Sequence, residues 1–283
     1  MQATAIVSET GDLTLSGITA PVPWWSFTKT VLSIASLRLV ENGLLSLDQP
    51  LGNARFNLRQ LLRHESGLPD YGYVSEYHSD VAAGKAPWPI ERLLATVDAD
   101  RLWYKPGAEW AYSNIGYLKV AQLIEQASGL TLKVALEQLV FGPSNLATAR
   151  LALVSADLDN VQMGNIQNYH PGWVFHGLVV GTVADAARLL QALMAGKLLK
   201  SATLAEMLQG RPLPEHGAVH SDPAYGLGLM LRANNSLDYP LGHMGEGPGS
   251  RIAVLARGRR VAAVWTTLPS TVDAEAHAIH LLS

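Results

Sequence analysis

The stretch Trp24-Trp25-Ser26-Phe27-Thr28-Lys29 opens an apolar run that continues to Asn42 and is followed by Gly43. The spacing of apolar residues from Phe27 to Asn42 predicts a helix, and Gly43 is well placed to end it. If Ser26 begins this helix, Ser26 and Lys29 share one face and their side chains can meet. A lysine whose pKa is lowered by burial can be the base that turns a serine hydroxyl into a nucleophile.

The Ser26–Lys29 pair also has a simpler interpretation, because its spacing is common. In a chain with 19 serines and 7 lysines among 283 residues, the expected number of Ser-x-x-Lys pairs by chance is about one half. In that interpretation Ser26 caps the helix and Lys29 is an exposed side chain. The pair therefore predicts chemistry only together with further polar residues.

Two other short segments offer such partners. In Tyr112-Ser113-Asn114 a phenol can share the proton of a lysine, and a carboxamide can hold the lysine or a substrate carbonyl. The alternative is an ordinary loop in which Asn114 caps the next helix. His243-Met244-Gly245 ends a predicted strand, where glycine lets a substrate approach the strand edge. His170-Pro171-Gly172 has the same pattern, but its proline predicts a turn.

The composition excludes several classes of function. Apolar residues make up 48% and charged residues 16% of the chain, which suits a globular protein with a large core. The net charge of −3 argues against a nucleic-acid partner. There is no cysteine, and none of the nine histidines has a metal-ligand spacing, so we expect no metal and no cofactor. No apolar run is long enough to span a membrane, and the start lacks a basic region and a long apolar segment. We therefore expect a soluble, cytoplasmic protein, or a periplasmic one if a leader segment was removed. The oligomeric state stays open between monomer and homodimer.

The pattern along the chain predicts an α/β (α+β) protein with one mixed, mainly antiparallel sheet built from both chain ends. Strands are predicted at 3–8 and 12–17, and again at 225–232, 239–244, 252–257 and 261–267, followed by a helix at 273–282. Turns are expected at 234–236, 245–249 and 258–259. Amphipathic helices are predicted between the two groups of strands, at 57–64, 89–98, 115–128, 131–140, 182–195 and 202–209. We therefore predict a sheet lobe from residues 1–55 and 216–283, a helical lobe from 56–215, and a cleft between them.

Taken together and in this order, the three polar segments resemble the serine β-lactamase and penicillin-binding-protein superfamily. The similarity is strongest to the branch of class C β-lactamases, D-amino-acid peptidases and serine esterases. That superfamily has a serine and a lysine one turn apart, then a Tyr-x-Asn loop, then a Lys/His-x-Gly strand. Further similar segments are Asn42–Leu51, Leu61–Pro69 and Tyr225–Gly228, so the resemblance runs from about residue 24 to 265.

The resemblance implies a role for each matching residue. Ser26 would attack a carbonyl and form an acyl-enzyme, with Lys29 and Tyr112 taking and returning its proton. Asn114 would hold the acyl group. The backbone N–H groups of Ser26 and Glu246, the latter following Gly245, would form an oxyanion hole. His243 would orient the leaving group or Tyr112.

Two departures from the superfamily pattern bear on the substrate. His243-Met244-Gly245 replaces the usual Lys-Thr-Gly, which removes a permanent positive charge suited to a β-lactam carboxylate. Glu246 brings a carboxylate beside the expected oxyanion hole, and the sequence leaves open whether it points inward. We therefore expect a serine hydrolase of small esters or amides. A β-lactamase or D-amino-acid peptidase, and a non-catalytic binding homologue, are the alternatives. We also expect Trp25, Tyr71 or Trp173 to line the cleft.

Overall fold

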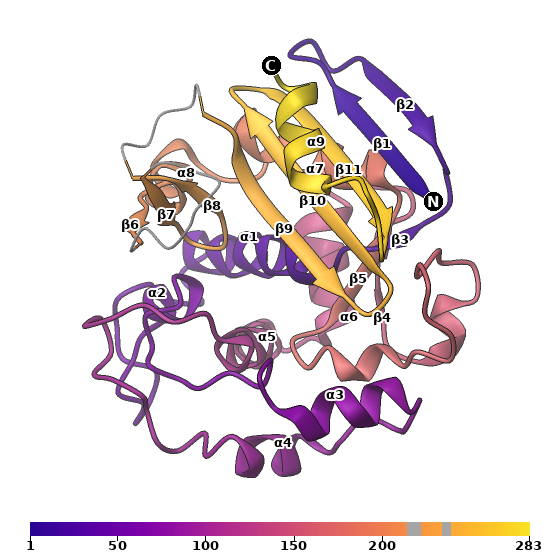
Figure 1. Cartoon of the computed structure of the whole chain (residues 1–283). Coiled ribbons are helices and arrows are strands. Elements are labelled where there is room, and N and C mark those ends of the chain that lie inside the picture. Colours follow the sequence, from indigo (N-terminus) through magenta and orange to yellow (C-terminus); the bar gives the residue numbers. More distant parts are fainter. Residues whose placement is uncertain (214–221, 234–238) are drawn as a thin grey trace.

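The computed structural model describes residues 1–213, 222–233 and 239–283. A large antiparallel sheet fills the upper half of the molecule in Figure 1, above a layer of helices. In spatial order its strands are β2 (Leu13–Gly17), β1 (Gln2–Val7), β11 (Arg260–Thr267), β10 (Ser250–Arg257), β9 (Leu241–Gly247), β8 (Met230–Arg232), β7 (Pro223–Tyr225) and β6 (Arg211–Pro212). A small second sheet has the order β3 (Val22–Pro23), β5 (Leu178–Gly181) and β4 (Arg150–Ala152).

The helices mostly follow the predicted ranges. They are α1 (Thr28–Glu41), α2 (Leu58–Leu62), α3 (Ser75–Ala82), α4 (Ile90–Thr96), α5 (Asn114–Ser128), α6 (Leu132–Leu136), α7 (Val183–Met194), α8 (Ser201–Met207) and α9 (Ala274–Leu281). A wider turn, Glu137–Phe141, continues α6. Helix α3 was not predicted, because its polar sequence has only a weak apolar stripe.

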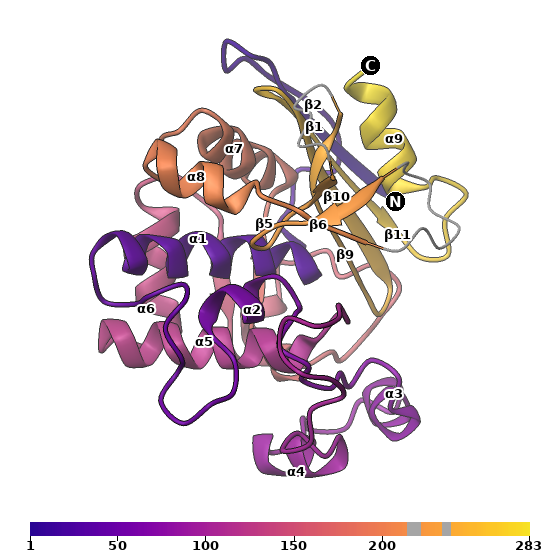
Figure 2. The same ribbon diagram turned by 90° about the vertical axis from the view of Figure 1, so that its left-hand side faces the viewer.

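Both ends of the chain form the sheet, as predicted. Strand β1 pairs with β11 along its whole length and with β2 on its other side. Helix α7 covers one face of the central strands and α9 covers the other, which Figure 2 shows from the side. Strands β10 and β11 are therefore buried on both faces. This explains why they are almost continuously apolar rather than alternating. The predicted fold class is confirmed.

Helix α1, which follows Ser26, lies at the centre of the molecule. Almost every side chain of α1 is buried, and its main helical neighbour is α5. Helix α5 begins at Asn114, and the hydroxyl of Ser113 caps it by accepting the Gly116 N–H at 2.9 Å. The sequence allowed Asn114 as that cap. Because Ser113 fills this position, the Asn114 side chain is free for other contacts.

Two predicted boundaries in the C-terminal strands are wrong. Residues 225–232, predicted as one strand, contain the end of β7, a tight turn and the whole of β8. The turn is Gly226–Leu229, in which the Gly226 N–H donates to the Leu229 carbonyl at 2.8 Å. Gly228 has φ +81°, which no β-strand allows. The predicted turn at 245–249 also begins too early, because β9 continues to Gly247.

The division into lobes stays a prediction. Helix α7 packs on the sheet although it falls in the segment assigned to the helical lobe. The boundary at 215/216 and the predicted turn at 234–236 lie outside the described residues.

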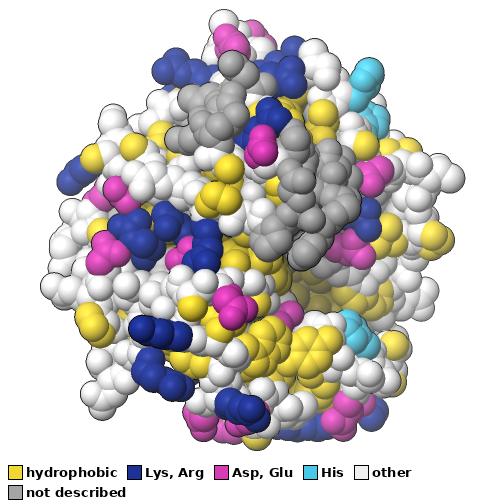
Figure 3. Space-filling model, turned by 60° about the vertical axis from the view of Figure 1, so that its left-hand side comes forward, with side chains coloured by type: hydrophobic (Ala, Val, Ile, Leu, Met, Phe, Trp, Pro, Cys, Tyr) yellow, Lys and Arg dark blue, Asp and Glu magenta, His cyan; other side chains and the backbone are white. Residues whose placement is uncertain are grey.

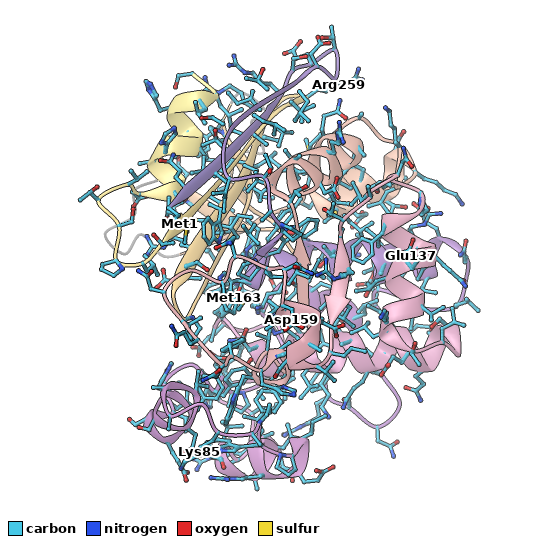
Figure 4. The ribbon with its side chains drawn as sticks, turned by 90° about the vertical axis from the view of Figure 1, so that its right-hand side faces the viewer. Met1, Lys85, Glu137, Asp159, Met163 and Arg259 are labelled. Carbon is cyan, nitrogen blue, oxygen red and sulfur yellow. The ribbon has the colours of Figure 1, made fainter. Side chains whose placement is uncertain are left out.

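Most of the charged side chains lie at the periphery of the fold, and Lys29 and Asp185 are among the buried exceptions. On the face drawn in Figure 3, lysines and arginines form small groups beside acidic residues. One arginine, Arg59, forms ion pairs with both Asp48 and Glu206. The basic run 257–260 is the tip of the β10–β11 hairpin, and Figure 4 places the exposed Arg259 at the outer end of the sheet. Within the described residues, no helix has the length and apolar character needed to cross a bilayer.

Candidate active site

Ser26 lies at the junction of the small sheet and the central helix. Strand β3 pairs with β5 and delivers the chain into a single 3-10 turn, Trp25–Phe27 (η1), from which α1 continues. Trp25 has φ +43°, a backbone conformation that is uncommon for a bulky residue and often marks functional sites. Its indole N–H donates to Ser250 Oγ at 3.1 Å, which ties this turn to the large sheet.

The hydroxyl of Ser26 meets both predicted partners. Lys29 Nζ lies 3.2 Å from Ser26 Oγ, and the phenol of Tyr112 donates to the same oxygen at 2.9 Å. Tyr112 comes from the loop before α5, 86 positions along the chain. The packing of α1 against α5 therefore brings the two motifs together.

Lys29 is buried and held from three sides. Besides Ser26, its Nζ donates to Asn114 Oδ1 at 2.7 Å and lies 3.2 Å from His176 Nε2. Burial lowers the pKa of Lys29 from 10.5 to about 7, although the nearby Asp70 carboxylate opposes the shift. The neutral form of the amine is therefore accessible near pH 7, and a neutral amine can accept a proton.

The pKa of Tyr112 is shifted in the opposite direction to that of Lys29. Burial raises the pKa of its phenol well above 10, so Tyr112 remains protonated at neutral pH. A protonated phenol donates a hydrogen bond to Ser26 Oγ and is not a base in this state. Of the two groups, Lys29 is thus the one suited to take the proton, and Tyr112 is placed to hold the oxygen and relay a proton later.

Strand β9 approaches Ser26 closely because of a glycine. A Cβ on Gly245 would lie 2.5 Å from the Trp24 carbonyl oxygen and 2.7 Å from the Ser26 nitrogen. A Cβ on Gly247 would collide with the Trp25 ring. Strand β8 pairs with β9 only at Met230 and Gly242. The rest of β9 on that side therefore faces the turn η1 instead of another strand. The backbone near Glu246 and the Ser26 N–H thus border one small space.

The Glu246 side chain points away from this space. Its carboxylate is half exposed and accepts a hydrogen bond from Arg251 Nε at 2.6 Å on the neighbouring strand β10. The strand alternation that buries Gly245 directs Glu246 outward. The carboxylate is paired with Arg251 there, and Glu246 also borders the cavity beside Ser26.

Among the described residues, no hydrogen bond joins His243 to the other predicted site side chains. It is fully buried, its Nε2 lies 2.8 Å from the Tyr225 hydroxyl, and its Nδ1 contacts the Met244 carbonyl. Burial and the nearby Lys29 lower the pKa of His243 to about 3, so the ring is neutral. It supplies no positive charge for a substrate carboxylate.

A cavity of about 180 Å³ opens beside Ser26. Its walls include the rings of Trp25, Tyr71, Tyr77 and Tyr169. The predictions for Trp25 and Tyr71 are confirmed, whereas Trp173 is buried among Trp88 and Tyr77 and does not line this cavity. None of the described residues that line it is a lysine or an arginine.

Sequence reasoning missed three residues around Lys29 and Tyr112. His64 is buried, stacks on the Tyr112 ring with centroids 4.3 Å apart, and accepts the Ser113 N–H at Nδ1. Asp70 accepts the Asn114 N–H at 2.7 Å and so fixes the start of α5. His176 touches Lys29 itself. His64 lies in a segment that supported the resemblance, but nothing in the sequence marks His176, which comes from a loop 147 positions away.

A family model described as beta-lactamase matches residues 19–283. The chain belongs to the beta-lactamase family. Among curated relatives, penicillin-binding protein 4* of Bacillus subtilis is 23% identical over 79% of this chain and 55% of its own length. Lovastatin esterase of Penicillium rubens is 24% identical over 77% of this chain and 67% of its own length. The chain thus spans about half the length of the first of these relatives.

Solved structures of other proteins share the fold of this chain. The D-amino acid amidase of Ochrobactrum anthropi SV3 has a TM-score of 0.79 at 21% identity, covering 99% of this chain and 92% of that one. A penicillin-binding protein from Bacillus halodurans has a TM-score of 0.81 at 20% identity, covering 99% and 95%.

Proposed function

We propose that this beta-lactamase family member is a serine hydrolase that forms an acyl-enzyme on Ser26. The observation that carries the proposal is the shared contact of Lys29 Nζ and the Tyr112 hydroxyl with Ser26 Oγ. Lys29 takes the proton as Ser26 Oγ attacks a carbonyl carbon, and the N–H groups of Ser26 and Glu246 bind the resulting oxyanion. One such donor is worth about 3 kcal/mol in related chemistry. Tyr112 then passes its proton to the leaving group and regains one from the Lys29 ammonium, so that no net proton is left on either side chain, and Asn114 holds Lys29 in place.

The preferred substrates in this proposal are small, uncharged esters or amides. Aromatic and aliphatic side chains make up much of the cavity lining beside Ser26, together with Asn114, two histidines and Glu246, which suits a mainly apolar acyl group. His243 is neutral and the described lining has no lysine or arginine, so a substrate carboxylate finds no cation there. The relatives named as esterase and D-amino acid amidase act on these bond types. The β-lactamase alternative would require a carboxylate partner.

Labelling with a fluorophosphonate probe, read out by intact-mass spectrometry, tests the nucleophile. The wild-type chain gains one adduct, and Ser26→Ala loses it and lowers ester turnover by about 10³-fold or more. Ser79→Ala, which changes an exposed serine on α3, is the matched control. It should keep both the adduct and the wild-type ester turnover. An unlabelled wild-type protein, or a label that survives Ser26→Ala, would contradict the proposal.

Turnover of p-nitrophenyl butyrate, D-phenylalanine amide and nitrocefin separates the substrate classes. We expect the ester or the amide to have the higher kcat/KM. Efficient hydrolysis of nitrocefin alone would favour the β-lactamase alternative. The cytoplasmic location, the monomer or homodimer state, and the lobe boundaries stay predictions from the sequence.

A further inference from the structure

The Lys29 amine has three polar neighbours, and the least expected is a histidine. His176 lies in the loop before β5 and its side chain is buried, 3% exposed. Its Nε2 is 3.2 Å from Lys29 Nζ, and its ring edge faces the Tyr117 ring on α5 with centroids 6.4 Å apart. The other ring nitrogen, Nδ1, is buried with no hydrogen-bond partner. Among the described residues, the one polar atom that hydrogen-bonds to the His176 ring is thus the lysine amine.

The three neighbours divide the hydrogens of the amine between them. A neutral amine has two N–H bonds and one lone pair, and Asn114 Oδ1 can only accept, so it takes one N–H. One N–H and the lone pair are left for Ser26 Oγ and His176 Nε2. If Nε2 accepts the second N–H, the lone pair faces the Ser26 hydroxyl. If Nε2 instead carries its own hydrogen, it occupies the lone pair and Lys29 cannot act as a base.

We propose that His176 is a positioning residue whose unprotonated Nε2 accepts an N–H of Lys29 and thereby directs the lone pair of the amine at Ser26. The inference rests on the proposed function. When Lys29 has taken the proton of Ser26, all three N–H bonds of the ammonium group have acceptors: Asn114 Oδ1, His176 Nε2 and the former hydroxyl oxygen. No further group has to move during proton transfer.

The surroundings keep the imidazole neutral, which this role requires. Burial, followed by the charge of Lys29, lowers the pKa of His176 well below 6.5. The titratable groups that face this cluster are Lys29 on α1, Tyr117 on α5, His64 after α2, Asp70 and Tyr112 in loops, and His243 on β9. Of these, Asp70 is the one that favours a charged lysine.

Two amide variants distinguish the role of Nε2 from simple packing. The side-chain amide of glutamine reaches about as far as Nε2 of histidine, whereas that of asparagine reaches only as far as Nδ1. His176→Gln therefore restores an acceptor beside Lys29, and His176→Asn does not. We expect His176→Asn to lower kcat and the rate of fluorophosphonate labelling by about 10²-fold, the usual effect of a misplaced base. His176→Gln should stay within about tenfold of wild type, and KM for p-nitrophenyl butyrate should change little in either variant.

The outcomes separate this inference from the proposed function. An unlabelled wild-type enzyme contradicts the proposed function and is seen before any His176 variant is made. A labelled wild type with equal rates in the Asn and Gln variants, whether both fast or both slow, overturns the role of His176 alone. The ¹⁵N chemical shifts of the His176 ring in the wild-type protein provide a test that needs no stable variant. We expect the Nδ1–H form, and an Nε2–H form at pH 8 would overturn the inference.

Discussion

Replacing Gly245 by alanine probes the close approach of β9 to the nucleophile. The added Cβ would lie 2.5 Å from the Trp24 carbonyl oxygen and 2.7 Å from the Ser26 nitrogen. Ordinary contacts between such atoms are about 3.5 Å, so the strand and the turn that carries Ser26 must separate by about 1 Å. Both are main-chain atoms, so no side-chain rotation can relieve the contact.

The displacement widens the space in which the oxyanion would be bound. A misplacement of about 1 Å can reduce the rate of an enzyme by about 10²-fold. We therefore expect Gly245→Ala to lower both kcat/KM for p-nitrophenyl butyrate and the rate of fluorophosphonate labelling by about 10²-fold. Overpacking costs about 1–3 kcal/mol of unfolding free energy, so the Tm should fall by only a few degrees in a chain of this size.

Gly116→Ala is the matched control. Gly116 lies near the start of α5. An added Cβ there would have only ordinary contacts, with its nearest neighbour, Ser113 Oγ, 3.6 Å away. Alanine favours a helix by about 1 kcal/mol over glycine, so this variant should keep its activity and its stability. Labelling of Gly245→Ala at the wild-type rate, with an unchanged Tm, would refute the reasoning about the approach of β9.

Two further predictions concern the base and the cavity. Because the active form of Lys29 is the neutral amine and its pKa is lowered to about 7, kcat/KM should rise with pH up to about 7 and level off above it. A pH profile from 5 to 10 measures this, and a rise that continues towards pH 10 would mean that the lysine is not shifted. Val81 on α3 is buried at the wall of the cavity, so Val81→Phe should lower kcat/KM for p-nitrophenyl butyrate more than for the acetate. Val134→Phe, at an exposed position on α6, should leave the ratio of the two esters unchanged, and equal losses for both esters in Val81→Phe would argue that the acyl group binds elsewhere.

Local sequence patterns were sufficient for most elements of the fold. The helix from Phe27, the hairpin at the start and the apolar strands at the end follow from periodicity, because side chains repeat every 3.6 residues in a helix and every two in a strand. Periodicity failed at 225–232, where the φ of Gly228 turns the chain back on itself. A buried turn and a buried strand have similarly apolar sequences.

The sequence by itself determined which residues could react: a serine and a lysine one helical turn apart, with a tyrosine, an asparagine and a histidine in later motifs. Only the tertiary structure decided which of them meet. It placed the Tyr112 hydroxyl on Ser26, directed Glu246 towards Arg251, paired His243 with Tyr225, and brought the unmarked His176 to Lys29. The physical reason is that contacts within one turn are fixed by local geometry. Contacts between distant segments, and the burial that lowers the pKa of Lys29, depend on how the helices and the sheet pack around them.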